Sequence, residues 1–228
     1  MSSKLLELSD IDPLTTHVLL GTLYFKGEWK EQFKVKNTKS DVFYGLTQRN
    51  EMLMNQYSVK HSYCETKKEQ WLEMEYLGDR LVMGFCLPKN EKENPANGML
   101  SIPLPTDFES TKLGTVTIPK FTHRIRVNLA PVMADKLGLK PLFEFSNDDK
   151  KGRWQELTDE NVCITKIIHE AVIIVDEVGT EAAAATAVTF GVRSMAAPPK
   201  KNFIANRSFS YYIRDKIENV VFFQGLYV

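Results

Sequence analysis

The stretch from Val162 to Val188 constrains the fold most, because a long apolar run passes through a single glycine into a run of small residues. Residues 162–178 are rich in Ile, Val and Thr and contain neither Gly nor Pro, so they predict one unusually long central strand. After Gly179 the chain continues as Thr-Glu-Ala-Ala-Ala-Ala-Thr. The high helix propensity of alanine favours a short helix here, yet small residues at alternate positions also suit a strand that enters a crowded sheet. Both conformations stay open, and such a segment can be exposed in one state and a strand in another.

Apolar runs bounded by turn residues make most of the remaining chain strand-rich. These runs lie at residues 18–25, 81–87, 209–213 and 220–223. One helix is predicted at residues 128–137, with Pro131 near its start and Gly138 just past its end. The 228 residues are enough for one domain with a sizeable core, and no linker rich in Gly, Pro or Ser divides them.

Composition excludes several classes of protein. The 29 Lys and Arg side chains balance the 29 Asp and Glu side chains, so no bulk positive field attracts nucleic acid or an anionic membrane. No apolar stretch has the length of a membrane-spanning helix. Cys64, Cys86 and Cys163 are widely spaced and odd in number, which predicts neither a disulfide framework nor a zinc site. We interpret them as small core or edge residues and expect no metal and no cofactor.

The sequence predicts that the chain is not an enzyme. Ser, His and Asp are present, but there is no Gly-x-Ser-x-Gly elbow, no phosphate-binding glycine loop and no His-Glu-x-x-His pair. His17, His61 and His123 have no reactive neighbours in the sequence and are interpreted as surface or packing residues. His169 lies inside the long apolar run, which by itself indicates a hydrogen-bonded core histidine.

Several blocks resemble the serpin family of serine protease inhibitors. The small-residue stretch is similar to the hinge and reactive-centre loop of an inhibitory serpin, and Leu19-Leu-Gly-Thr-Leu-Tyr-Phe-Lys-Gly-Glu-Trp29 resembles the third strand of sheet A of that family. Further blocks match in the family's order at residues 72–88, 116–121, 137–143, 203–214 and 222–225. So many ordered blocks are far more specific than one short motif.

The resemblance implies an α+β serpin fold, with mixed β-sheets A, B and C and helices. Residues 1–228 are expected to form one serpin domain, its C-terminal part, with the reactive-centre loop at about residues 177–200. The first residues resemble the end of the helix that crosses sheet A, so the N-terminal third or more of the family's fold is expected to be absent. A fragment, an alternative product and one part of a protein that needs a partner segment all stay open, and a truncated product is favoured.

The reactive bond is expected between Arg193 and Ser194. The family's spacing from Gly179 ends on Arg193, which is also the only Lys or Arg between Lys166 and Lys200. A trypsin-like protease binds such a residue through an acid in its primary pocket. The family's hinge corresponds here to Glu177, Gly179, Thr180, Glu181, Ala182, Ala183, Ala184, Ala185 and Thr186.

Four residues match positions where the family's sheet A opens. Trp29 matches the tryptophan at the breach, and Lys120 and Glu177 match a salt bridge at the top of the long strand. His169 matches the shutter histidine, but Gly21 replaces the asparagine that the family usually places beside it. Each match has a purely structural alternative. Trp29 can be an ordinary aromatic core residue, Lys120 and Glu177 can be two unrelated solvated charges, and Arg193 can be an incidental loop arginine.

The function that the resemblance implies is suicide inhibition of a trypsin-like serine protease, with no nucleic acid or membrane as a partner. The alternatives are a non-inhibitory serpin acting as carrier, chaperone or store, an inactive truncated product, and a binding domain unrelated to proteases. Open sheet edges predict self-association. The native N-terminus is expected to be absent, so the compartment is undecided, with an extracellular location favoured.

Overall fold

The computed structural model describes residues 11, 15, 17–90, 104–145, 162–180 and 201–228. Their strands are β1 (His17–Tyr24), β2 (Gly27–Glu28), β3 (Lys39–Tyr44), β4 (Gln48–Glu65), β5 (Glu69–Glu75), β6 (Leu81–Pro88), β7 (Glu109–Pro119), β8 (Phe121–Asn128), β9 (Ile164–Val175), β10 (Gly179–Thr180), β11 (Phe203–Ile204), β12 (Phe209–Asp215) and β13 (Val221–Tyr227). The helical elements are α2 (Ala130–Lys136) and the 3-10 turns η2 (Val35–Asn37) and η3 (Lys140–Phe143). The chain divides into two compact units, Met1–Phe25 with Thr122–Ile173 and Lys26–Phe121 with Ile174–Val228.

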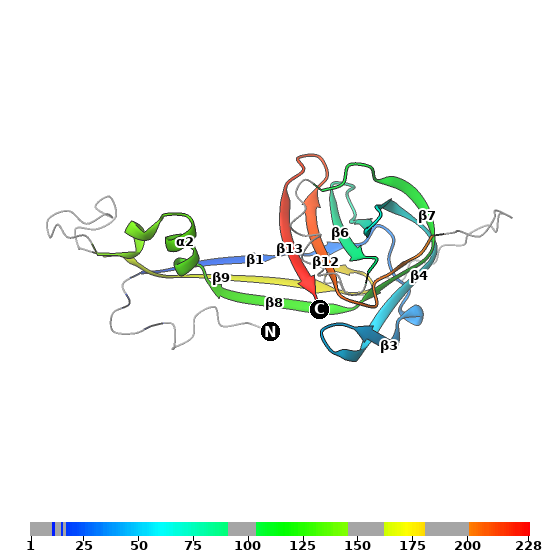
Figure 1. Ribbon diagram of the computed structural model, residues 1–228, viewed down its shortest axis with the longest axis horizontal. Coiled ribbons are helices and arrows are strands. Elements are labelled where there is room, and N and C mark those ends of the chain that lie inside the picture. Colours follow the sequence, from blue (N-terminus) through cyan, green and yellow to red (C-terminus); the bar gives the residue numbers. More distant parts are fainter. Residues whose placement is uncertain (1–10, 12–14, 16, 91–103, 146–161, 181–200) are drawn as a thin grey trace. The chain divides into compact units, whose positions relative to one another are not determined.

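The first unit contains a three-stranded sheet in the order β1-β9-β8 (Figure 1). β9 is the long strand that the apolar run predicts, and it pairs in parallel with β1 so that Leu20 lies opposite Ile168 and Gly21 opposite His169. It ends at Val175 because Asp176 begins a turn. β1 is therefore an end strand of this sheet in the described part of the chain.

Helix α2 begins two residues later than the sequence spacing predicts. The Asn128 side-chain oxygen accepts hydrogen bonds from the backbone N–H groups of Ala130 and Ile167, each at 3.1 Å. The backbone N–H of Leu129 also donates to the carbonyl of Ile167 at 2.7 Å. These contacts keep residues 128 and 129 bound to β9, so the helix itself starts only at Ala130. Gly138 follows the helix with a φ of +68°, a value that glycine adopts without strain.

The second unit contains a sheet in the order β11-β7-β4-β5-β6-β12-β13, with β3 on one end of β4. Its core is aromatic, with Phe85 packed edge-on against Phe209 and Phe209 stacked on Tyr227. β6 and β12 are almost entirely buried, as expected for central strands with continuous apolar runs. A separate two-stranded pairing joins β10 to β2.

Candidate functional site

A tight turn, the hinge turn (Asp176–Gly179), leads from the end of β9 into β10. The Asp176 carboxylate accepts hydrogen bonds from the backbone N–H groups of Val178 at 2.9 Å and Gly179 at 3.1 Å. The backbone N–H of Asp176 donates to the carbonyl of Gly179 at 2.9 Å, which closes the turn. A side chain on Gly179 would meet the carbonyl oxygen of Gly27 at 2.1 Å, so β10 can pair with β2 only because residue 179 is glycine. The turn thus fixes how β9 leads into β10.

Trp29 packs directly against the hinge turn. Its backbone N–H donates to the carbonyl of Val178 at 2.8 Å, and its indole N–H donates to the carbonyl of Asp176 at 2.9 Å. The indole stacks on the Tyr76 ring with 4.5 Å between centroids, and only 1% of Trp29 is exposed. Trp29 therefore supplies hydrogen-bond donors to two carbonyls of the hinge turn.

Glu177 is a buried carboxylate with two side-chain donors. Lys120 Nζ donates to one oxygen and Thr38 Oγ1 donates to the other, both at 2.8 Å. The expected Lys120–Glu177 salt bridge is therefore present. Burial by itself raises the pKa of the Glu177 carboxyl, but the hydrogen bonds from Lys120 and Thr38 and the charge of Lys120 hold it below its ordinary value.

Glu177→Gln should lower the free energy of unfolding at pH 7 by about 1 kcal/mol, because Lys120 loses a charged partner. The folded protein favours the deprotonated carboxylate, so this stabilisation is complete above the ordinary pKa of 4.5 and is lost as the pH falls through the lower folded value. Denaturant unfolding should therefore show the two proteins converging below about pH 4. Glu144→Gln is the control, because Glu144 is 52% exposed in its pair with Lys140 and should change little at any pH. A gap that is constant with pH would contradict the assignment.

Gly21 and His169 lie opposite each other where β1 meets β9, and we call this contact the β1–β9 seam. A side chain at position 21 would begin 3.4 Å from the imidazole Nδ1, at ordinary contact distance. Gly21, which replaces the family's asparagine, therefore lies beside His169, as the sequence predicts. Among the described residues no hydrogen bond to the half-buried imidazole is found, which differs from the expected bonded core histidine.

The remaining predicted residues fall largely outside the described part of the chain. Thr180 forms the end of β10. Arg193, Ser194, Glu181, Ala182, Ala183, Ala184, Ala185 and Thr186 lie outside the described residues. Sequence reasoning missed Thr38, Tyr76 and Asp176, of which only Asp176 carries a signal, since Asp-x-x-Gly is typical of a side-chain-closed turn.

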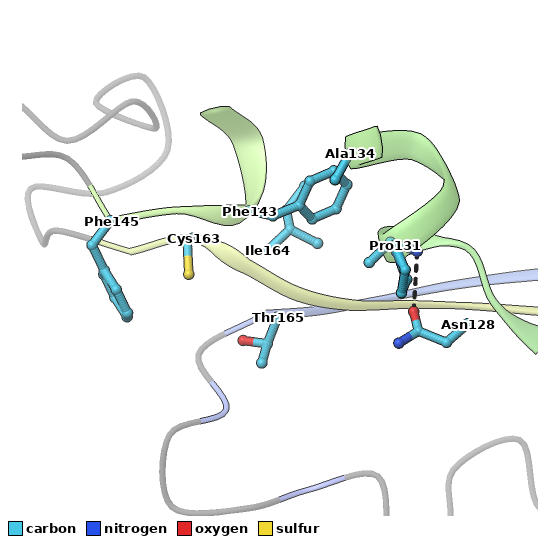
Figure 2. Close-up of a pocket in the computed structure, with 9 residues that line it drawn as sticks. Asn128, Pro131, Ala134, Phe143, Phe145, Cys163, Ile164 and Thr165 are labelled. Carbon is cyan, nitrogen blue, oxygen red and sulfur yellow. Dashed lines mark hydrogen bonds between the residues drawn. The ribbon is translucent and has the colours of Figure 1, made fainter. Parts of the chain in front are cut away.

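A shallow pocket of about 380 Å³ lies beside α2 (Figure 2). Its lining is mostly apolar, and the Asn128 amide oxygen already accepts the Ala130 N–H. Cys163 is buried and lines this pocket, Cys86 is buried and Cys64 is half-buried, so all three are small core or edge residues as predicted. Within the described ranges no group of three His, Cys, Asp or Glu side chains could hold a metal, and no helix is long and apolar enough to cross a membrane.

Comparison with known proteins gives a consistent match over nearly the whole chain. The family model described as "Serpin (serine protease inhibitor)" matches residues 3–228. The uncharacterized serpin-like protein R700 of Acanthamoeba polyphaga mimivirus is 32% identical over 240 residues, which cover 100% of this chain and 58% of that protein. Serpin B8 of Homo sapiens is 30% identical over 231 residues, which cover 98% of this chain and 60% of that protein.

The fold agrees with a solved structure. Serpin48 from the insect Tenebrio molitor superposes with a TM-score of 0.78 at 24% identity, over 97% of this chain and 58% of that chain. The chain thus spans 58–60% of the length of these three proteins.

Proposed function

The chain belongs to the serpin family of serine protease inhibitors and has the serpin fold, and from this we propose that it carries the bait and hinge of an inhibitor of trypsin-like proteases. The observation that carries the proposal is how the start of the small-residue segment is held. Glu177 is bound by Lys120 and Thr38, and Gly179 is pressed against β2. A small-residue segment that moves into the sheet after cleavage needs such a defined starting position.

The proposed reaction begins when the serine of the protease attacks the carbonyl carbon of Arg193. An acyl-enzyme ester forms, the peptide bond to Ser194 breaks, and the new amino group of Ser194 leaves with a proton. The segment from Thr180 onward then inserts between β1 and β9, an established form of strand addition that releases stored strain. The tethered protease is carried along and distorted before water can hydrolyse the ester. In this proposal the chain itself contributes no catalytic residue.

Trypsin should cleave between Arg193 and Ser194, because Arg193 is the only Lys or Arg between Lys166 and Lys200. Mass spectrometry should detect a C-terminal peptide that begins at Ser194. Arg193→Ala should remove this product, whereas Lys200→Ala should leave it in place. A first cut at any other residue of the loop would contradict the assignment of the bait.

A non-inhibitory serpin is the second candidate, and Gly21 is the observation that favours it. With glycine opposite His169, the β1–β9 seam has no side-chain bond at this point among the described residues. Denaturing electrophoresis after incubation with trypsin separates the two functions. An inhibitor gives a covalent complex of higher mass, and a carrier or store gives only the cleaved chain.

A further inference from the structure

The hinge turn rests on a short segment, the support segment (residues 27–30), that is also fixed from behind. On the hinge side, Gly27 and Glu28 pair with β10, and the Trp29 N–H donates to the carbonyl of Val178 at 2.8 Å. On the other side, the carbonyl of Glu28 accepts the Leu77 N–H at 2.8 Å, and the Lys30 N–H donates to the carbonyl of Glu75 at 2.9 Å. The support segment therefore lies between the hinge turn and the turn that joins β5 to β6.

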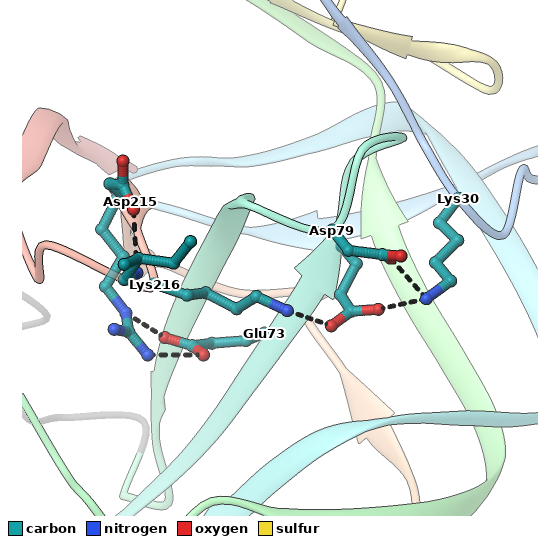
Figure 3. A network of polar contacts seen from close by, with 8 residues as sticks. Lys30, Glu73, Asp79, Asp215 and Lys216 are labelled. Carbon is teal, nitrogen blue, oxygen red and sulfur yellow. Dashed lines mark hydrogen bonds and ion pairs between the residues drawn. The ribbon is translucent and has the colours of Figure 1, made fainter.

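Four charged side chains strengthen the attachment on the far side of the support segment (Figure 3). Lys30 Nζ lies 2.9 Å from a carboxylate oxygen of Glu75 and 2.5 Å from one of Asp79. The ammonium group of Lys216, just past the end of β12, contacts the other oxygen of Glu75. Glu75 thus bridges two lysines. Hydrogen bonds from Lys216 and then Lys30 hold the pKa of its carboxyl below the ordinary value, so the bridge is charged at neutral pH.

The β5–β6 turn is built to present Asp79 to Lys30. Gly78 and Asp79 both have positive φ values, +92° and +57°, and aspartate is one of the few residues that adopts this region readily. The turn is also held from β12, because the Lys216 N–H donates to the carbonyl of Arg80 at 2.9 Å and Arg80 pairs with Asp215 at 2.5 Å. A continuous set of contacts therefore runs from β12 through the turn to Lys30.

We propose that Lys30, Glu75, Asp79 and Lys216 form an electrostatic latch that sets how readily Gly179 and Thr180 separate from β2. Separation requires the hinge-side bonds of the support segment to break, and those bonds persist while the segment is fixed from behind. Loosening Lys30 lets the support segment move and weakens its pairing with β10. Only the role of the latch in inhibition rests on the proposed function, because separation of the hinge from β2 is the first step of loop insertion. The latch is accessible to salt because its side chains are 30–66% exposed.

Site-resolved amide hydrogen exchange measures the latch without a protease. In Lys30→Met, which keeps the aliphatic stem and removes the charge, the Trp29 N–H should exchange about twofold to fivefold faster than in the parent protein. The Gly114 N–H, which donates to Lys201 elsewhere in the same unit, should be unchanged. Salt at about 1 M should speed Trp29 exchange in the parent protein but not in the variant. Lys89→Met is the matched control, because its pair with Glu65 has similar exposure, 35% and 31%, and does not contact the hinge turn.

Two results would overturn the latch. One is Trp29 exchange in Lys30→Met that equals that of Lys89→Met. The other is an equal acceleration at Trp29 and Gly114, which would mean general destabilisation. If Lys30→Met does not fold, Glu75→Gln removes the same bridge with little change of shape and is read in the same way. The exchange experiment uses no protease, so its result holds even if the chain inhibits no protease. Conversely, an exchange result that contradicts the latch does not affect the test for complex formation.

Discussion

In a form of the protein as long as its serpin relatives, Ala182→Glu should leave cleavage after Arg193 intact and lower the yield of stable protease complex at least about tenfold. The proposed insertion places Thr180, Ala182, Ala184 and Thr186 on one side of the new strand, because side chains alternate along a strand. An unpaired carboxylate on the buried side stalls insertion, so hydrolysis of the acyl-enzyme wins. Thr180→Arg should act in the same way. Denaturing electrophoresis with trypsin gives both the complex and the cleaved product in one lane.

Ala183→Glu is the matched control for this effect. It introduces the same charge one residue away, on the opposite side of the strand, and should reduce complex formation less than Ala182→Glu. Complex formation by Ala182→Glu at the parental yield would show that the small-residue segment does not insert and would remove the hinge assignment. Equal loss in both variants would mean that both sides of the inserted strand are closely covered.

The parts of the site that sequence could predict are those that a family pattern fixes over long distances. Lys120 and Glu177 are 57 residues apart, and neither local periodicity nor composition relates them, yet their ammonium and carboxylate groups meet at 2.8 Å. The same resemblance placed Gly21 beside His169 across two parallel strands. The long strand β9, by contrast, follows from its own residues, since a run of Ile, Val and Thr without Gly or Pro favours extension.

The parts that sequence missed depend on single polar atoms or on broken periodicity. Thr38 lies in a polar stretch, and its hydroxyl becomes a partner of Glu177 only because chain segments 139 residues apart meet. β4 runs for 18 residues, but Ser58 has a φ of +54° and leaves the pairing with β7 between Tyr57 and Val59. Leu53 and Met54 are buried in succession and Tyr57 and Ser58 are exposed in succession, so the strand has no single period for a sequence pattern to detect.

The 228-residue chain by itself should not inhibit trypsin stoichiometrically, although its sequence carries a complete bait and hinge. Insertion stabilises a serpin when the new strand is flanked on both sides within a broad, supported sheet. Among the described residues β1 is the end strand of a three-stranded sheet, with Leu19, Leu20, Leu23 and Tyr24 between 37% and 51% exposed. In a sheet with that edge open, the inserted strand is poorly stabilised. Insertion is then expected to be slower than hydrolysis of the acyl-enzyme. Trypsin should therefore cut the chain and be released active.

The same edge predicts what the chain does instead. Among the described residues the outer edge of β1 pairs with no other strand, and β1 carries apolar side chains and has no lysine or proline to block pairing, which favours association with a second copy. Sedimentation should show oligomers that grow with concentration, and Leu20→Lys, which places a charge on this strand, should reduce them. Val35→Lys is the control, because it adds the same charge at a residue that is 70% exposed and lies outside the strands. A denaturant-stable complex formed at near one-to-one yield by the monomeric chain would refute the prediction that the chain does not inhibit trypsin, because the strands that it carries would then suffice to hold the inserted loop.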